Sequence, residues 1–178
     1  MNSALDMVFI NVSDEVGEQA FSEIQTLAVH LEKMLSCFDP EAEVFQLNQK
    51  AINEYCLVSS QLWNILVECN RFRKSTLGYF DIGLQKLKEL GKSNPSLVLS
   101  SKSMGMETIE FSEEQHSIKF WSENTGIDLG AVGKGILLRE VEKVLSKFDI
   151  LNCFISFGGS SIITRGSHSH GPNGLYRC

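Results

Sequence analysis

The sequence has 178 residues, enough for one domain with a sizeable hydrophobic core. Its 43% hydrophobic and 21% charged residues are ordinary for a globular protein, and no apolar run approaches the roughly 20 residues that span a bilayer. The formal net charge of −6 argues against nucleic acid as a partner, since domains that bind it carry a basic patch. The N-terminus lacks the basic and apolar regions of a signal peptide, so we expect a cytoplasmic location.

The cysteines favour a reducing compartment. They are odd in number, scattered and without a C-x-x-C pair, which argues against a disulfide framework or a zinc site. The pattern fits buried thiols. The five are Cys37, Cys56, Cys69, Cys153 and Cys178.

The chain begins with a strand and a long helix. Leu5–Val12 is rich in Val, Ile and Phe, which predicts a strand. After an N-cap at Ser13 or Asp14, apolar residues recur at three- and four-residue steps, which predicts an amphipathic helix. Pro40 ends the helical pattern, and Glu43–Asn48 predicts a short turn or helix.

A second helix and a hairpin follow. Tyr55–Val58 predicts a strand, and Ser59 and Ser60 offer a cap for a helix that ends at Gly78. The polar side of this helix is expected to be solvated, and it carries Glu68, Arg71, Arg73 and Lys74. Two alternating runs, Glu107–Phe111 and Ser117–Trp121, then predict a β-hairpin.

The glycine break leads directly into Tyr79-Phe80-Asp81. Two aromatic rings and a carboxylate in such a place can present a flat surface and an acceptor to a heterocycle. The alternative is that both rings anchor the loop in the core while Asp81 caps a following helix through Leu90.

The second half contains a glycine-rich turn in front of a helix. Ile127–Gly135 places a carboxylate, three glycines and Lys134 ahead of a strong helical pattern. Free N–H groups and the helix dipole favour a phosphate there, and Lys134 adds a cation. Gly135 stands where a Walker A loop needs Ser or Thr, and the spacing does not fit a Rossmann fingerprint. The alternative is a tight turn in which glycine serves only backbone geometry.

The chain closes with two further strands, Asn152–Phe157 and Ile162–Arg165. Gly158 and Gly159 between them permit positive φ or the close approach of a ligand, or form a bulge. Because the last strand leaves a sheet edge unpaired before a Gly/Ser-rich tail, we expect a chain truncated at its C-terminus.

With these elements in order, the sequence resembles the ApbE family of FAD:protein FMN transferases over almost the whole chain. Each motif is weak alone, but their order and spacing are specific. The matching segments are Leu35–Phe38 with Glu43–Asn48, Gly78–Asp81, Asp128–Gly135 and Phe157–Ser160. The resemblance implies an α+β, T-fold-like mixed sheet flanked by helices, with residues 1–178 forming one partial domain.

The resemblance also implies an activity and a site. FMN would pass from FAD to a Ser or Thr hydroxyl of an acceptor protein, with magnesium assisting and AMP leaving. No residue is assigned as catalytic acid, base or nucleophile, and the backbone carbonyl of Ala131 is implied as a magnesium ligand. The implied cofactor-binding residues are Met1, Phe38, Tyr79, Phe80, Asp81, Asp128, Lys134, Gly158 and Gly159.

Three departures from the family pattern matter. Asn2-Ser3 follows Met1 where the family has Gly-Thr, and Ala42-Glu43 replaces a Ser-Glu pair. The later His-x-x-Asp-Pro segment, and the Asp and Thr that supply side chains to magnesium, have no counterpart in the sequence. We therefore expect a flavin-facing half without a complete metal site. The alternatives are a flavin-binding remnant without turnover and a purely structural domain.

Overall fold

The computed structural model describes residues 3–87 and 104–167, so Met1 and the tail beyond Ser167 lie outside the described residues. The chain divides into two compact units. Unit 1 comprises Met1–Glu32 and Val132–Cys178, and unit 2 comprises Lys33–Ala131. The second unit is therefore inserted, in sequence, between the two stretches of the first.

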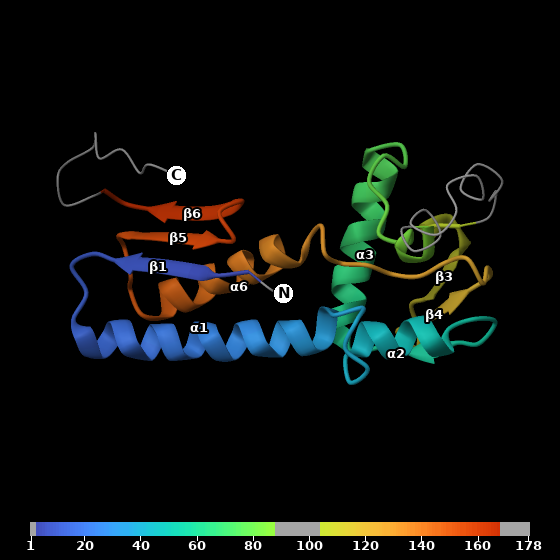
Figure 1. Cartoon of the computed structure of the whole chain (residues 1–178), viewed down its shortest axis with the longest axis horizontal. Coiled ribbons are helices and arrows are strands. Elements are labelled where there is room, and N and C mark those ends of the chain that lie inside the picture. The colour runs from blue at the N-terminus through green and yellow to red at the C-terminus, as the bar shows by residue number, and fades with distance from the viewer. Residues whose placement is uncertain (1–2, 88–103, 168–178) are drawn as a thin grey trace. The chain divides into compact units, whose positions relative to one another are not determined.

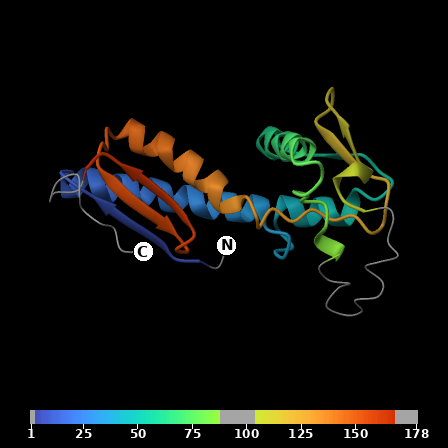
Figure 2. The same ribbon diagram turned by 90° about the horizontal axis from the view of Figure 1, so that it is seen from above.

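Unit 1 contains a three-stranded antiparallel sheet in the order β1-β5-β6. Helices α1 and α6 lie on the same side of this sheet (Figures 1 and 2). Helix α1 continues past the end of the first stretch into unit 2. The elements are β1 (Leu5–Phe9), α1 (Asp14–Leu35), α6 (Gly133–Lys147), β5 (Cys153–Phe157) and β6 (Ser161–Arg165).

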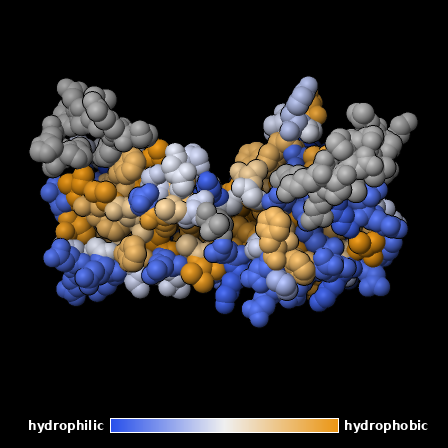
Figure 3. Space-filling view, in the orientation of Figure 1, coloured by the Kyte–Doolittle hydropathy of each residue, from blue (hydrophilic) through white to orange (hydrophobic). Residues whose placement is uncertain are grey.

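The strand register sorts the side chains of unit 1 onto two faces. Ile155 pairs with Met7 on one side and Ile163 on the other, and it is fully buried. The next position along each strand points the opposite way, and there Val8 and Ile162 remain exposed. Figure 3 shows apolar residues gathered over this second face. The core of unit 1 therefore lies between the sheet and its helices.

Unit 2 holds the second sheet, also antiparallel, in the order β2-β4-β3. Its core is apolar and includes Leu62, Leu66, Ile118 and Phe120. The elements are α2 (Glu43–Lys50), β2 (Cys56–Leu57), α3 (Ser60–Ser75), the 3₁₀ turn η1 (Met106–Thr108), β3 (Ile109–Ser112) and β4 (Ser117–Phe120).

The predicted N-caps of α1 and α3 and the glycine end of α3 are confirmed, whereas α1 already ends at Leu35, before the predicted stop at Pro40. The Val16 N–H points at the Ser13 hydroxyl at 3.4 Å, and the Leu62 N–H donates to the Ser59 hydroxyl at 3.2 Å. Gly78 adopts φ +86° just beyond α3, where its N–H donates to the Arg73 carbonyl at 2.9 Å. Side-chain oxygens at N-caps and a left-handed glycine at the C-terminus satisfy the free backbone groups of helices.

The α+β class is confirmed, but the described strands form two antiparallel sheets and not one mixed sheet. Two of the pairings, β3–β4 and β5–β6, are hairpins with short connections, which enforce antiparallel pairing, while β1–β5 and β2–β4 join distant segments and are antiparallel as well. None of the helices in the described ranges is long and apolar enough to cross a bilayer.

Candidate functional site

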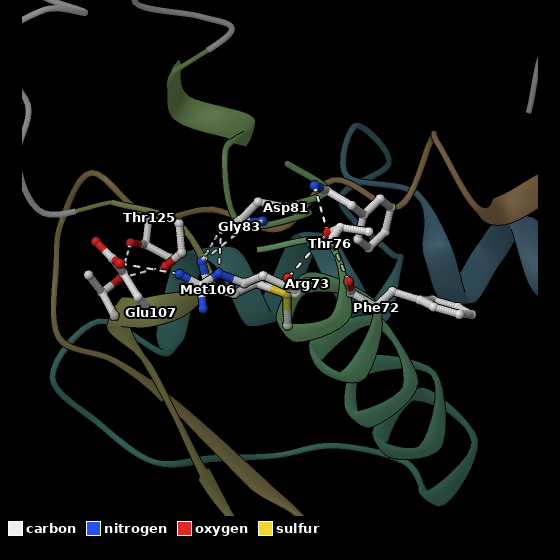
Figure 4. Close-up of polar contacts among 11 residues, drawn as sticks. Phe72, Arg73, Thr76, Asp81, Gly83, Met106, Glu107 and Thr125 are labelled. Atoms are coloured by element: carbon white, nitrogen blue, oxygen red, sulfur yellow. Dashed lines mark hydrogen bonds and ion pairs between the residues drawn. The ribbon is translucent and has the colours of Figure 1, made fainter. Parts of the chain in front are cut away.

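Asp81 is the centre of a polar network in unit 2 (Figure 4). Its Oδ1 accepts hydrogen bonds from the backbone N–H of Gly83 at 2.7 Å and of Met106 at 3.1 Å. Its Oδ2 accepts from Nε of Arg73 at 3.1 Å, and the side chain is only 9% exposed. Of the two sequence interpretations, the structure supports a local structural role for this carboxylate. Contact with a cofactor stays a prediction.

Gly105 makes room for this carboxylate. A Cβ at Gly105 would lie 2.7 Å from Oδ2 of Asp81, and the residue has φ +89°. Both facts favour glycine, because side-chain-bearing residues rarely adopt that φ and the added carbon would clash. The turn before Met106 is thus shaped around Asp81.

The aromatic residues differ in exposure. Tyr79 is 95% exposed, so the interpretation that it anchors the loop in the core is wrong. Phe80 is partly buried and packs edge-on against Phe72, with ring centroids 6.1 Å apart. Phe38, after the end of α1, is 78% exposed. Tyr79 and Phe38 therefore offer open ring surfaces in unit 2.

The segment that carries Asp128 is held by a buried amide. Nδ2 of Asn48 donates to the Ile127 carbonyl at 2.9 Å, and the Ile127 N–H donates to Oδ1 of Asn48 at 2.7 Å. The next N–H, that of Asp128, donates to the Ile82 carbonyl at 2.8 Å. The structure thus places the Asp81 and Asp128 segments side by side.

Asp128 itself is partly buried, and its Oδ1 accepts from the Gly130 N–H at 2.8 Å. Ala131, three residues on, is exposed. Within residues 3–87 and 104–167, no three His, Cys, Asp or Glu side chains lie together as metal ligands. Magnesium binds through several oxygen ligands, usually with carboxylates among them. The described residues do not fit such a centre, and the role of Ala131 stays a prediction.

In unit 1, Lys134 lies in the first turn of α6. The N-cap residue Val132 makes no side-chain capping bond, so the first N–H groups of the helix lack that partner. Nζ of Lys134 donates to the Ser160 hydroxyl at 3.0 Å and lies 5.9 Å from the Phe157 ring centroid. Among the residues that the structure describes, Lys134 forms no ion pair.

Gly158, the first glycine of the pair between β5 and β6, lies against this lysine. Gly158 and Gly159 have φ +60° and +67°, so the predicted positive φ is confirmed. A Cβ at Gly158 would lie 2.9 Å from Nζ of Lys134 and 3.0 Å from Cβ of Ser3, whereas one at Gly159 would meet nothing within 4 Å. Within unit 1 the structure therefore brings Lys134 and Gly158 together.

The sequence did not predict the roles of two residues in these networks. Arg73 was expected on a solvated face, but it pairs with Asp81 and is 22% exposed. Asn48 belonged to a motif without an assigned role, yet it is 5% exposed and clamps Ile127. The only sequence signal was the position of Asn48 beside apolar residues in a short helix.

Comparison with known proteins gives one family. The ApbE family model matches residues 1–174. The chain is 28% identical over 163 residues to the FAD:protein FMN transferase of Chlamydia muridarum, covering 86% of this chain and 51% of that protein. The FAD:protein FMN transferase of Chlamydia trachomatis is 26% identical over 169 residues, which cover 90% of this chain and 53% of that protein. The chain spans about half the length of these curated relatives.

Solved structures share the fold. The flavin transferase ApbE from Vibrio cholerae superposes with a TM-score of 0.83 at 20% identity, over 96% of this chain and 58% of that one. The ApbE protein from Thermotoga maritima gives a TM-score of 0.74 at 19% identity, and the match covers 88% of this chain and 56% of that one.

Proposed function

The chain belongs to the ApbE family, and from that premise we propose that it supplies the flavin-binding part of an FAD:protein FMN transferase. The observation that carries the proposal is Lys134, a cation in the first turn of α6 without an ion-pair partner among the described residues. A helix N-terminus without a side-chain cap, together with an unpaired ammonium, favours a phosphate or diphosphate.

The proposed reaction is a phosphoryl transfer. The hydroxyl oxygen of a Ser or Thr in the acceptor protein bonds to the phosphorus of the FMN half of FAD. The bond from that phosphorus to the bridging oxygen breaks, AMP leaves with the oxygen, and the hydroxyl proton passes to solvent. Such reactions depend mainly on charge neutralisation and positioning, and Lys134 contributes the charge on this chain.

Magnesium would supply further charge neutralisation on the diphosphate. Since the described residues do not form a carboxylate centre for it, we assign it no step. The ring of the flavin is assigned to stack on Phe38 and Tyr79, whose side chains are 78% and 95% exposed. Phe80, Asp81 and Asp128 are assigned to the same ligand, and a cytoplasmic location remains part of the proposal.

The proposal is tested by FAD titration, followed by quenching of flavin fluorescence. We expect Lys134→Ala to weaken FAD binding roughly tenfold, as for a lost charge-assisted contact. Riboflavin, which lacks phosphate, should bind both proteins equally. The matched control is Lys143→Ala, an exposed lysine of the same helix that pairs with Glu140. A wild-type chain that binds no FAD contradicts the proposal.

Turnover is tested separately. The chain is incubated with FAD, magnesium and a Ser/Thr-containing acceptor peptide, and the products are examined for covalent flavin and released AMP. Both products together support transfer. Binding without either product would support the alternative of a flavin-binding remnant.

A further inference from the structure

We propose that Arg73 is a positioning residue of the flavin site, acting through Asp81. The inference rests on the proposed function and adds to it a residue that the family motifs in this sequence do not include. Arg73 lies on the last turn of α3, and Asp81 lies beyond the glycine break that ends this helix. The two charged groups therefore connect a helix to the loop that carries the aromatic side chains.

The contacts of Arg73 are specific. Its Nε donates to Oδ2 of Asp81 at 3.1 Å, while its NH2 group donates to Oε2 of Glu107 at 3.2 Å. The guanidinium thus joins two acidic groups from separate segments (Figure 4). Because Asp81 is 9% exposed and Glu107 is 55% exposed, the pair with Asp81 is less screened by water.

Asp81 passes this restraint to the backbone. Its carboxylate binds the N–H groups of Gly83 and Met106, so it fixes the loop against the η1 turn. Ile82 lies between Asp81 and Gly83 in the sequence, and its carbonyl accepts a hydrogen bond from the Asp128 N–H. Arg73 is therefore linked, through one carboxylate, to both loop segments that the proposal assigns to FAD. Loss of the guanidinium would leave that carboxylate without its counter-charge and free to reorient.

Neighbouring cations on α3 do not share this arrangement. Arg71 is exposed, and its side chain forms no ion pair or hydrogen bond with another described residue. It has the same charge on the same helix, two residues away. Arg71→Ala is therefore a matched control for the loss of positive charge.

The test measures FAD binding and backbone protection in the 178-residue chain. We expect Arg73→Ala to weaken FAD binding roughly threefold to tenfold, in the lower part of the range for coupled neighbouring groups, and Arg71→Ala to leave it unchanged. Arg73→Lys, which keeps the charge, should restore part of the affinity. In Arg73→Ala the amides of Gly83 and Met106 should exchange with deuterium faster, while those of α6 stay unchanged.

A double-mutant cycle tests the route through Asp81. If Arg73 acts through that carboxylate, Arg73→Ala should have little further effect on FAD affinity in an Asp81→Asn background. Additive effects, or an Arg73→Ala protein with wild-type affinity, overturn the inference. Unchanged deuterium exchange at Gly83 and Met106 in Arg73→Ala also overturns the inference. This measurement needs no FAD, so it still tests the role of Arg73 if the wild-type chain binds no FAD and the proposed function fails. Global unfolding of Arg73→Ala would appear as faster exchange in every element of unit 2. In that case the inference is decided by the FAD affinity and the Gly83 and Met106 exchange of Arg73→Lys.

Discussion

The two units hold their candidate residues in different ways. In unit 2, polar side chains bind backbone groups that are far away in sequence, as Asn48 does with Ile127 and Asp81 with Met106. In unit 1, Lys134 has a neutral hydroxyl and an aromatic ring as its neighbours, beside a turn of two positive-φ glycines. The Asn48 and Asp81 side chains of unit 2 are therefore bound to backbone groups of their own unit, whereas Lys134 of unit 1 forms no ion pair with another described residue.

This difference predicts how substitutions will act. Changes within the networks of unit 2 should reduce stability, because buried polar groups lose their partners. Changes at Lys134 should reduce affinity for an anion and leave the fold intact. The following variants are ordered from the largest expected effect to the smallest.

The largest effect is expected for Asn48→Ala. It leaves the N–H and the carbonyl of Ile127 buried without a partner, which should cost about 2–4 kcal/mol of unfolding free energy. Both tryptophans, Trp63 and Trp121, lie in unit 2, so urea unfolding followed by their fluorescence reports on it. The exposed Asn124 provides the control, and Asn124→Ala should change stability little. Equal stability of the two variants would contradict a stabilising role for the two hydrogen bonds between Asn48 and Ile127.

Phe38→Ala should act on affinity alone. If the ring stacks on the flavin, its loss should weaken FAD binding by about 1–3 kcal/mol. The side chain is 78% exposed, so the melting temperature should stay the same. Isothermal titration with FAD and a thermal melt separate the two quantities. Unchanged affinity would remove Phe38 from the site.

Gly158→Ala and Gly159→Ala form a matched pair in unit 1. Both place a side chain at positive φ, which costs about 1–2 kcal/mol. Only the Cβ at residue 158 also approaches Nζ of Lys134, at 2.9 Å. We expect Gly158→Ala to be the less stable in a circular dichroism melt, and to bind FAD more weakly than Gly159→Ala. Identical FAD affinities would show that the turn does not position Lys134.

The smallest effect concerns a surface cluster of unit 2. Hydrogen bonds from Tyr55 and then from Trp121 lower the pKa of Glu110, and Nε1 of Trp121 lies 2.8 Å from its carboxylate. A carboxylate with a lowered pKa stabilises the fold above its unfolded pKa, and this contribution is lost as pH falls through the folded pKa. Trp121 fluorescence should therefore change in that acidic range. Glu110→Gln should abolish the change, and its persistence would assign the titration to another group.

The sequence predicted what depends on local pattern. Apolar periodicity indicated α1, α3 and α6, and the capping residues Ser13 and Ser59 indicated where α1 and α3 begin, because these features depend on residues a few positions apart. Alternating runs indicated the β3–β4 hairpin, and an apolar run followed by Gly158 and Gly159 indicated β5 and β6. The glycine-rich turn before α6 was placed correctly, and positive φ at Gly158 follows from the absence of a side chain.

The contacts between distant segments could not be predicted. Asn48 and Ile127 are 79 residues apart, and nothing in either local pattern indicates the other. Arg73 has the spacing of a solvated helix residue, and only the course of the loop after Gly78 brings Asp81 to it. Met106 takes part through its backbone N–H, which every residue except proline has. The family resemblance assigned Asp81 to the cofactor and did not indicate the contacts of its carboxylate with Arg73, Gly83 and Met106.

The discontinuity of unit 1 has a consequence for synthesis on the ribosome. Unit 2 is one uninterrupted stretch, Lys33–Ala131, and all of it has been translated before β5 exists. Strand β1 must wait for β5, since Leu5 pairs with Phe157. Domains fold as units during translation, and contacts between distant residues form slowly. Stalled nascent chains should therefore become protease-resistant first in residues 33–87 and 104–131, while β1 stays unpaired until β5 has emerged from the ribosome.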